Sequence, residues 1–235
     1  GRLLDSKTQA VLEQRTKELV GLGLFVVGVL AVMILGSYVP EDPSWLSVTD
    51  EPAMNLLGRF GASIASPLFI IVGWGAWGFA AVSIIWGARL MFHWGAERAL
   101  SRIIFAPIWI ALVSVYASTH VPASEWTHSF GLGGLFGDTV LGAILNVVPV
   151  TATIGLKFMA LIVAFSAVGM GLHVLGFSMR EVRRIARFLG VGFILAYAHL
   201  MSLLGRGAQG AVAGAGNMRA RHAERQERKR VEAED

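Results

Sequence analysis

The sequence has 235 residues, of which 54% are hydrophobic and only 15% are charged. Soluble domains carry about 25% charged residues, so this composition excludes an ordinary water-soluble globular domain. Cysteine is absent, which excludes disulfides, thiolate metal sites and cysteine nucleophiles. Four stretches reach the roughly 20 apolar residues that a membrane-spanning helix needs. We therefore predict an all-α membrane protein with four transmembrane helices.

The first predicted element is a polar cytoplasmic segment over residues 1–18. It leads into the first span, residues 19–38, which contains no charged side chain and would be about 30 Å long as a helix. Gly21 and Gly28 lie on one stripe of this helix. Small residues let helix backbones approach closely, so the stripe predicts tight packing against another span.

A polar connection follows, in which acidic residues alternate with prolines before a run of small residues. This pattern is typical of a chain that leaves the membrane, turns and returns. The second predicted span covers residues 67–92. It carries a face of small residues for helix contact, namely Gly75, Gly78, Ser83 and Gly87.

The third predicted span is residues 103–121, with Pro107 in its first turns, where a proline disrupts a helix least. The connection after this span contains no Lys or Arg. Within it, residues 138–146 are apolar but too few to cross a membrane, so we expect a short interfacial or re-entrant helix. The fourth predicted span is residues 153–177, which completes a membrane domain over residues 19–177.

Residues 188–205 allow two interpretations. They are mostly apolar, and a fifth span is one of them. However, four arginines precede them and seven Lys or Arg follow them, so a spanning helix would place one basic cluster on the wrong side of the membrane. We favour an interfacial or juxtamembrane helix within residues 178–205. A Gly-rich linker and charged cytoplasmic tail, residues 206–235, follow it.

The distribution of Lys and Arg predicts the orientation. Four of the twenty lie in residues 1–18, three in residues 89–102 and eleven in residues 180–230. The connection after the first span holds one, and the connection after the third span holds none. Because basic residues concentrate on the cytoplasmic side, we expect both termini in the cytoplasm and the two longer connections outside.

Motifs for catalysis are weak. The sequence has no G-x-x-x-x-G-K-[ST] loop for a nucleotide, and its spans hold no carboxylate of the kind an ion pump needs. His120, Glu125 and His128 are close in sequence but follow no helical spacing for a metal site. Ser166 and Ser178 lack a paired acid for an intramembrane hydrolase. We expect no catalytic residue, no cofactor and no metal, and keep a small channel or transporter as the alternative function.

Three motifs give the sequence a family resemblance. The first is Asp42-Pro43-Ser44-Trp45 followed by Asn55, Gly58, Gly61 and Gly73 at fixed spacing. The second is Gly133-Gly134 followed by Gly137, and the third is Gly176-Phe177-Ser178. In this order they resemble the N-terminal four-span membrane domain of FtsK/SpoIIIE-type DNA translocases, over residues 10–205.

The resemblance implies a membrane anchor at the division septum of the cell's inner membrane. In the family, a linker leads from this domain to a hexameric ATP-driven motor that moves chromosomal DNA. The chain would then be no enzyme itself, would form a homo-oligomer, would contact membrane lipid and other cell-division proteins, and would meet DNA only through a motor outside it. Structural or partner-binding candidates are Asp42, Pro43, Ser44, Trp45, Asn55, Gly58, Gly61, Gly73, Gly133, Gly134 and Gly137.

Two roles remain open for the first motif. In one, Asp42 or Ser44 caps an external turn while Trp45 lies at the membrane interface and fixes where the first span ends. In the other, the same residues recognise a division partner outside the membrane.

Overall fold

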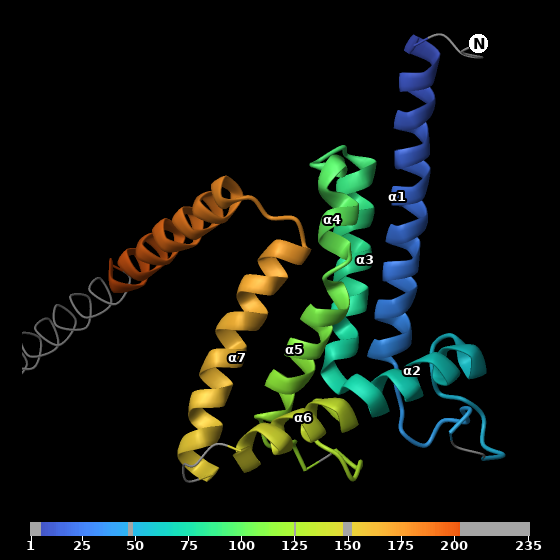
Figure 1. The fold of residues 1–235 in the computed structure, drawn as a ribbon, viewed down its shortest axis with the longest axis vertical. Helices are drawn as coiled ribbons and strands as arrows, with labels where there is room; N and C mark the ends of the chain where they lie inside the picture. Colours follow the sequence, from blue (N-terminus) through green and yellow to red (C-terminus); the bar gives the residue numbers. More distant parts are fainter. Residues whose placement is uncertain (1–5, 47–48, 125, 148–151, 203–235) are drawn as a thin grey trace, which may run out of the picture. The chain divides into compact units, whose positions relative to one another are not determined.

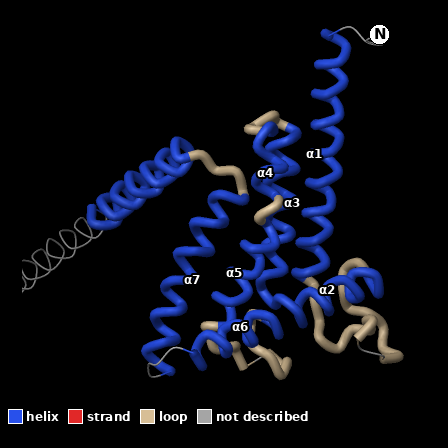
Figure 2. The backbone as a smooth tube through the Cα atoms, viewed as in Figure 1, coloured by secondary structure: helices blue, strands red, loops and turns tan. Residues whose placement is uncertain are grey.

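The computed structural model describes residues 6–46, 49–124, 126–147 and 152–202. In these ranges all regular structure is helical and no strand occurs (Figure 2), as the all-α prediction requires. The predicted tail over residues 206–235 lies outside the described residues. The chain divides into two compact units, Gly1–Ser178 and Met179–Asp235, which we describe separately.

In the first unit, α1 (Ser6–Gly36) and α3 (Ala76–Met91) lie side by side along most of the length of α3 (Figure 1). Their main chains touch. A Cβ atom added to Gly28 would lie 2.7 Å from the backbone nitrogen of Ile84, and one added to Gly87 would lie 2.5 Å from the main chain of α1. The glycine stripe of the first span is therefore used for helix packing within the chain, as its spacing predicts.

The helix before α3 begins earlier than predicted. We expected the second span to start at Pro67, but α2 (Gly58–Val72) already includes that proline. The turn η1 (Gly73–Gly75) then joins α2 to α3. Figure 1 shows α2 running across the end of α1, whereas α3 lies along α1. Small residues on one face of α2 permit this approach, and its buried residues are Gly61, Ala62, Ala65, Ser66 and Phe69.

The span predicted over residues 103–121 is interrupted near its start, at residues 104–105. The structure has η2 (Ala96–Arg98), α4 (Ala99–Ile103) and α5 (Ala106–Ser118) in this region. The axes on either side of the break differ by 56°. Pro107 explains the break, because proline has no N–H for the carbonyl four residues earlier and its ring clashes with that carbonyl. That carbonyl belongs to Ile103, the last residue of α4.

Two further helices complete the first unit. The predicted short helix within residues 138–146 is confirmed as α6, although α6 (Gly134–Val147) begins four residues earlier. The fourth predicted span is α7 (Ala152–Val174). α5 packs against both α6 and α7, and Figure 1 shows α6 lying across the end of α5.

By length and apolarity, the described residues contain four candidate spans, or five when the bent pair at α4 and α5 counts as one more. The four are Thr8–Gly36, Gly58–Met91, Thr153–Val174 and, in the second unit, Met179–Ser202. This confirms the fold class of an all-α membrane protein. Our interfacial placement of residues 188–205 rests on the basic residues that flank them, and it stays a prediction.

The end of α7 is closed by a helix cap. The N–H of Phe177 donates to the carbonyl of Leu172 at 2.9 Å, and the N–H of Gly176 donates to the carbonyl of His173 at 3.1 Å. Gly176 has φ +78°, a left-handed conformation that glycine adopts without strain. These features define a Schellman motif, which accounts for the glycine and the aromatic residue of the third sequence motif.

This cap packs against α3. Trp86 is 1% exposed, and its indole N–H donates to the carbonyl of Val174 at 2.7 Å. Arg89 is 6% exposed, and its guanidinium carbon lies 5.2 Å from the ring centre of Phe177 and 5.9 Å from that of Trp86. Cation–π contacts of this kind stabilise a buried guanidinium. We call this end of the first unit, where α3 turns toward α4, the N-terminal end.

Candidate functional site at the loop end

The opposite end of the first unit carries the connections from α1 to α2 and from α5 to α6, and we call it the loop end. Asp42 is its central acid. The carboxylate is 5% exposed and accepts hydrogen bonds from the N–H groups of Met54 at 2.7 Å and Asn55 at 3.0 Å. Buried charge is costly unless it is hydrogen-bonded, and two N–H donors satisfy this one. Asp42 thus links the first part of the α1–α2 connection to its last part by hydrogen bonds.

Asn55 continues this network toward α1. Its side-chain amide donates to the carbonyl of Ile34 at 2.8 Å and to that of Ser37 at 3.3 Å. Carbonyls at a helix C-terminus lack hydrogen-bond donors within the helix. The side-chain amide of Asn55 is the donor for these two carbonyls at the end of α1. Its side-chain oxygen accepts from the N–H of Leu57 at 3.1 Å. A Cβ atom at Gly61 would lie 2.0 Å from the same oxygen, so glycine is required there.

The main chain at Gly73 passes very close to the main chain at Gly134. The N–H of Trp74 donates to the carbonyl of Leu132 at 2.8 Å. A Cβ atom at Gly73 would lie 2.0 Å from that carbonyl oxygen, and one at Gly134 would lie 2.6 Å from the nitrogen of Gly73. Gly73 also has φ +54° with ψ −129°, and Gly134 has φ +69°. Other residues are strained in such conformations.

Gly133 and Gly137 bring the second connection onto α5. Cβ atoms there would lie 2.0 Å and 2.5 Å from the carbonyl oxygen of Ser114. The buried hydroxyl of Ser114 donates to the carbonyl of Gly133, and the hydroxyl of Ser118 donates to Asp138 at 2.7 Å. Our sequence analysis did not include these two serines or Asp138 among the candidate residues. Their signal was present, because the serines stand one helical turn apart in an apolar segment.

A column of rings joins the two connections. Phe69 stacks on Tyr38 at 4.3 Å, Tyr38 on His128 at 5.8 Å, and His128 on Phe130 at 4.5 Å between ring centres. The hydroxyl of Tyr38 lies 3.0 Å from Nε2 of His128. Burial lowers the pKa of His128 from its ordinary value of 6.5, and the charge of Glu41 opposes that shift. The neutral imidazole is therefore the form that this column favours.

The residues that we weighed as a metal site do not come together as one. His128 belongs to the ring column, and Nδ1 of His120 lies 3.1 Å from the carbonyl of Tyr116. Glu125 is outside the part of the chain that the structure describes. In that part, no three His, Asp or Glu side chains are placed to hold a metal ion.

The eleven candidates from the sequence thus fall into two groups and an exception. One group surrounds Asp42 and Asn55. Pro43 is buried there, the Ser44 hydroxyl lies 3.2 Å from that of Ser66, and the N–H of Gly58 donates to the carbonyl of Asn55 at 2.7 Å. The other group, which we call the glycine crossing, comprises Gly73, Gly133, Gly134 and Gly137. Trp45 is the exception at 86% exposure. It belongs to a set of exposed apolar side chains at the loop end, comprising Trp45, Leu46, Met54, Leu56 and Phe60.

These observations define a class of protein. It is a multi-pass α-helical membrane domain whose loops are fastened by buried hydrogen bonds and glycine contacts. Residues 13–187 match the family described as the 4TM region of DNA translocase FtsK/SpoIIIE. The chain belongs to this family.

Relatives carry the same name. The chain is 33% identical over 193 residues to DNA translocase FtsK of Azospirillum brasilense, covering 79% of this chain and 30% of that relative. It is 29% identical over 157 residues to that of Caulobacter vibrioides, covering 63% and 19%. It is 33% identical over 156 residues to that of Brucella melitensis biotype 1, covering 63% and 18%. No solved structure matches the chain.

The chain therefore spans less than a third of each of these relatives. What it matches is the family's membrane region, and the match does not extend to an ATPase motor.

Proposed function

We propose that this chain is the membrane-anchoring and oligomerising domain of an FtsK-like DNA translocase that acts in cell division and chromosome segregation. The observation that carries the proposal is the family match over residues 13–187. Because the relatives are more than three times longer than the matched part, the ATP-driven motor would lie outside this chain. DNA would then meet the motor and not this domain.

The proposed placement is the inner membrane at the division septum. A fluorescent fusion of the chain in dividing cells should form a band at midcell. Trp45→Ala should weaken the band, because Trp45 is the candidate residue whose side chain is available to a partner. Trp94→Ala is the matched control, since Trp94 is 61% exposed at the N-terminal end. A uniform membrane signal from the unaltered fusion would contradict the septal role.

The proposed topology has both termini in the cytoplasm and the loop end outside. It is supported by the distribution of Lys and Arg. The absence of cysteine makes a labelling test simple, because each variant then has one thiol. An impermeant maleimide added to intact spheroplasts should label Ser129→Cys and leave Ala220→Cys unlabelled. Labelling of Ala220→Cys from outside would mean that residues 188–205 cross the membrane.

Oligomerisation rests on the family resemblance. The glycine faces of α1 and α3 pack against each other within one chain, so they do not argue for contacts between chains. Native mass spectrometry of the purified chain in mild detergent should give a homo-oligomer, with six subunits as the expected number by resemblance. A monomer at every protein concentration would remove oligomerisation from the proposed function.

The channel or transporter alternative would need polar groups that converge on a path between the helices. Among the described residues, the single buried carboxylate, Asp42, lies in a connection between helices. The buried polar or charged side chains there are Asp42, Asn55, Ser66, Ser83, Arg89 and Ser114. Saturable solute flux in proteoliposomes would favour the alternative over the anchor.

A further inference from the structure

A groove of about 480 Å³ lies at the N-terminal end, between α1 and Met91, the last residue of α3. Arg15, Glu18, Leu19, Leu22 and Met91 line it. The polar and apolar parts of this lining are separated along α1. Arg15 and Glu18 come first, and the leucines follow within the next helical turn, about 5 Å further along the axis. The groove is therefore charged at one end and apolar at the other.

The position of the groove matches a membrane boundary. α1 carries charged residues up to Glu18 and none over residues 19–36. The hydrocarbon region thus begins near Leu19, since charged side chains are costly inside it. On the other side, α3 ends in Met91 and is followed by His93 and Trp94, and tryptophan concentrates at headgroup level. A lipid in this groove would have its headgroup at Arg15 and its chain beside Leu22.

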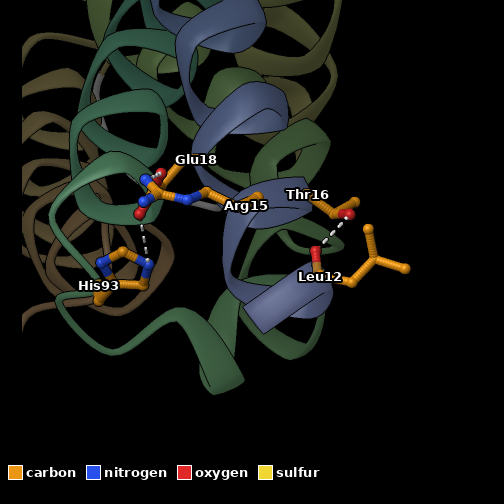
Figure 3. A network of polar contacts seen from close by, with 5 residues as sticks. All are labelled: Leu12, Arg15, Thr16, Glu18 and His93. Atoms are coloured by element: carbon orange, nitrogen blue, oxygen red, sulfur yellow. Dashed lines mark hydrogen bonds and ion pairs between the residues drawn. The ribbon is translucent and has the colours of Figure 1, made fainter. Parts of the chain in front are cut away.

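The charged end of the groove presents both signs. Figure 3 shows Arg15, Glu18 and His93 together. A guanidinium nitrogen of Arg15 lies 2.7 Å from one oxygen of Glu18, and Nε2 of His93 lies 3.6 Å from the other oxygen. The Arg15 side chain is 69% exposed, so much of its guanidinium faces outward. Guanidinium matches phosphate geometry, and a carboxylate accepts hydrogen bonds from an ammonium group.

We propose that this groove binds a phospholipid with a primary ammonium headgroup, such as phosphatidylethanolamine. Arg15 binds the phosphate, Glu18 accepts hydrogen bonds from the ammonium, and Leu19, Leu22 and Met91 contact an acyl chain. The opposite charges of Arg15 and Glu18 select a zwitterionic headgroup over an anionic one. A methylated ammonium has no N–H to donate, so phosphatidylcholine would bind more weakly.

The test is native mass spectrometry of the full chain, titrated with phosphatidylethanolamine, phosphatidylcholine and phosphatidylglycerol of identical acyl composition. Phosphatidylethanolamine should bind most tightly. Arg15→Gln should weaken its binding about fivefold, which is the effect of one basic residue near a membrane surface. Glu18→Gln should remove the preference for phosphatidylethanolamine over phosphatidylcholine. Leu22→Trp, which fills the apolar part, should weaken all three lipids alike.

The same helix supplies a matched control. Lys17 and Glu13 also form an ion pair at 2.7 Å, but neither lines the groove. Lys17→Gln should therefore leave lipid binding unchanged. Equal losses from Lys17→Gln and Arg15→Gln would overturn the proposal in favour of a general surface charge effect. Tighter binding of phosphatidylglycerol than of phosphatidylethanolamine, or no preference between the ethanolamine and choline lipids, would also overturn it.

Discussion

The loop end and the N-terminal end of the first unit are each stabilised by a different kind of interaction. At the loop end, buried side chains bind main-chain groups, as Asp42 binds the N–H groups of Met54 and Asn55. At the N-terminal end, one tryptophan and one arginine pack under a helix cap. Close main-chain contacts occur at both ends, as Gly21 and Gly87 show where α1 meets α3. At the loop end, however, two of the glycines concerned, Gly73 and Gly134, also have positive φ, which other residues adopt only with strain. The crossing of Gly73 and Gly134 at the loop end should therefore be more sensitive to substitution than the Trp86 contact at the N-terminal end.

The largest effect should come from the glycine crossing. Gly73→Ala places a methyl group 2.0 Å from the carbonyl oxygen of Leu132 in a backbone conformation reserved for glycine. We expect a loss of about 3 kcal/mol or more, seen as little monodisperse protein in size-exclusion chromatography. Gly142→Ala on α6 is the control, because nothing lies within 4 Å of its added Cβ. Equal recovery of both variants would remove the contrast between the two ends.

The next effect should come from the buried acid. Asp42→Ala leaves the N–H groups of Met54 and Asn55 without their acceptor. The N–H of Asn55 is buried, and a buried donor without a partner costs about 1–3 kcal/mol, so we expect a clear fall in the thermal unfolding midpoint. Asp50→Ala removes an exposed acid from the same connection and should change the midpoint little. If the two variants unfold at the same temperature, Asp42 does not fasten the loop.

A smaller effect is expected at the N-terminal end. Trp86→Phe keeps most of the buried ring and loses the hydrogen bond to the carbonyl of Val174. The expected cost is about 1–2 kcal/mol, measurable as a lower denaturant midpoint in detergent. Trp74→Phe, at a half-exposed position, serves as the comparison. A larger loss from Trp86→Phe than from Asp42→Ala would reverse the ranking of the two ends.

The smallest effect concerns pH. Burial lowers the pKa of His128 below 6.5, so the unfolded chain binds a proton more readily than the folded chain. Stability is then fully present above that value and falls as the pH drops through the lowered pKa. His128→Phe keeps a ring in the column and should flatten the dependence of the thermal midpoint on pH. If the thermal midpoint of this variant depends on pH as in the unaltered protein, a group other than His128 causes the pH dependence.

The sequence predicted the helices well and their contacts poorly. Charge-free runs such as residues 19–38 show directly where apolar helices lie, because a lipid environment demands them. Gly73 and Gly133 were singled out by the family resemblance, but their contacts lie far away along the chain. Nothing local indicates that Gly73 would meet Leu132. Pro107 was placed in the first turns of a helix, and it does lie in the first turn of α5, but the sequence analysis did not include α4 or the break before α5.

The interpretation of the first sequence motif also changed with the structure. Spacing alone left capping and partner recognition open for Asp42 and Trp45. The carboxylate of Asp42 turns inward to main-chain donors, whereas the ring of Trp45 is 86% exposed. In this one motif, Asp42 therefore stabilises the loop, whereas the side chain of Trp45 lies exposed on its surface.

The Schellman cap at Gly176 has a mechanical consequence. The chain leaves the first unit directly after Ser178, so any pull on the residues that follow reaches Phe177 first. Phe177 is hydrogen-bonded to Leu172 and covers Arg89, and Trp86 holds the carbonyl of Val174. We expect these contacts with α3 to resist unwinding of α7 from its C-terminal end when the residues after Ser178 are pulled.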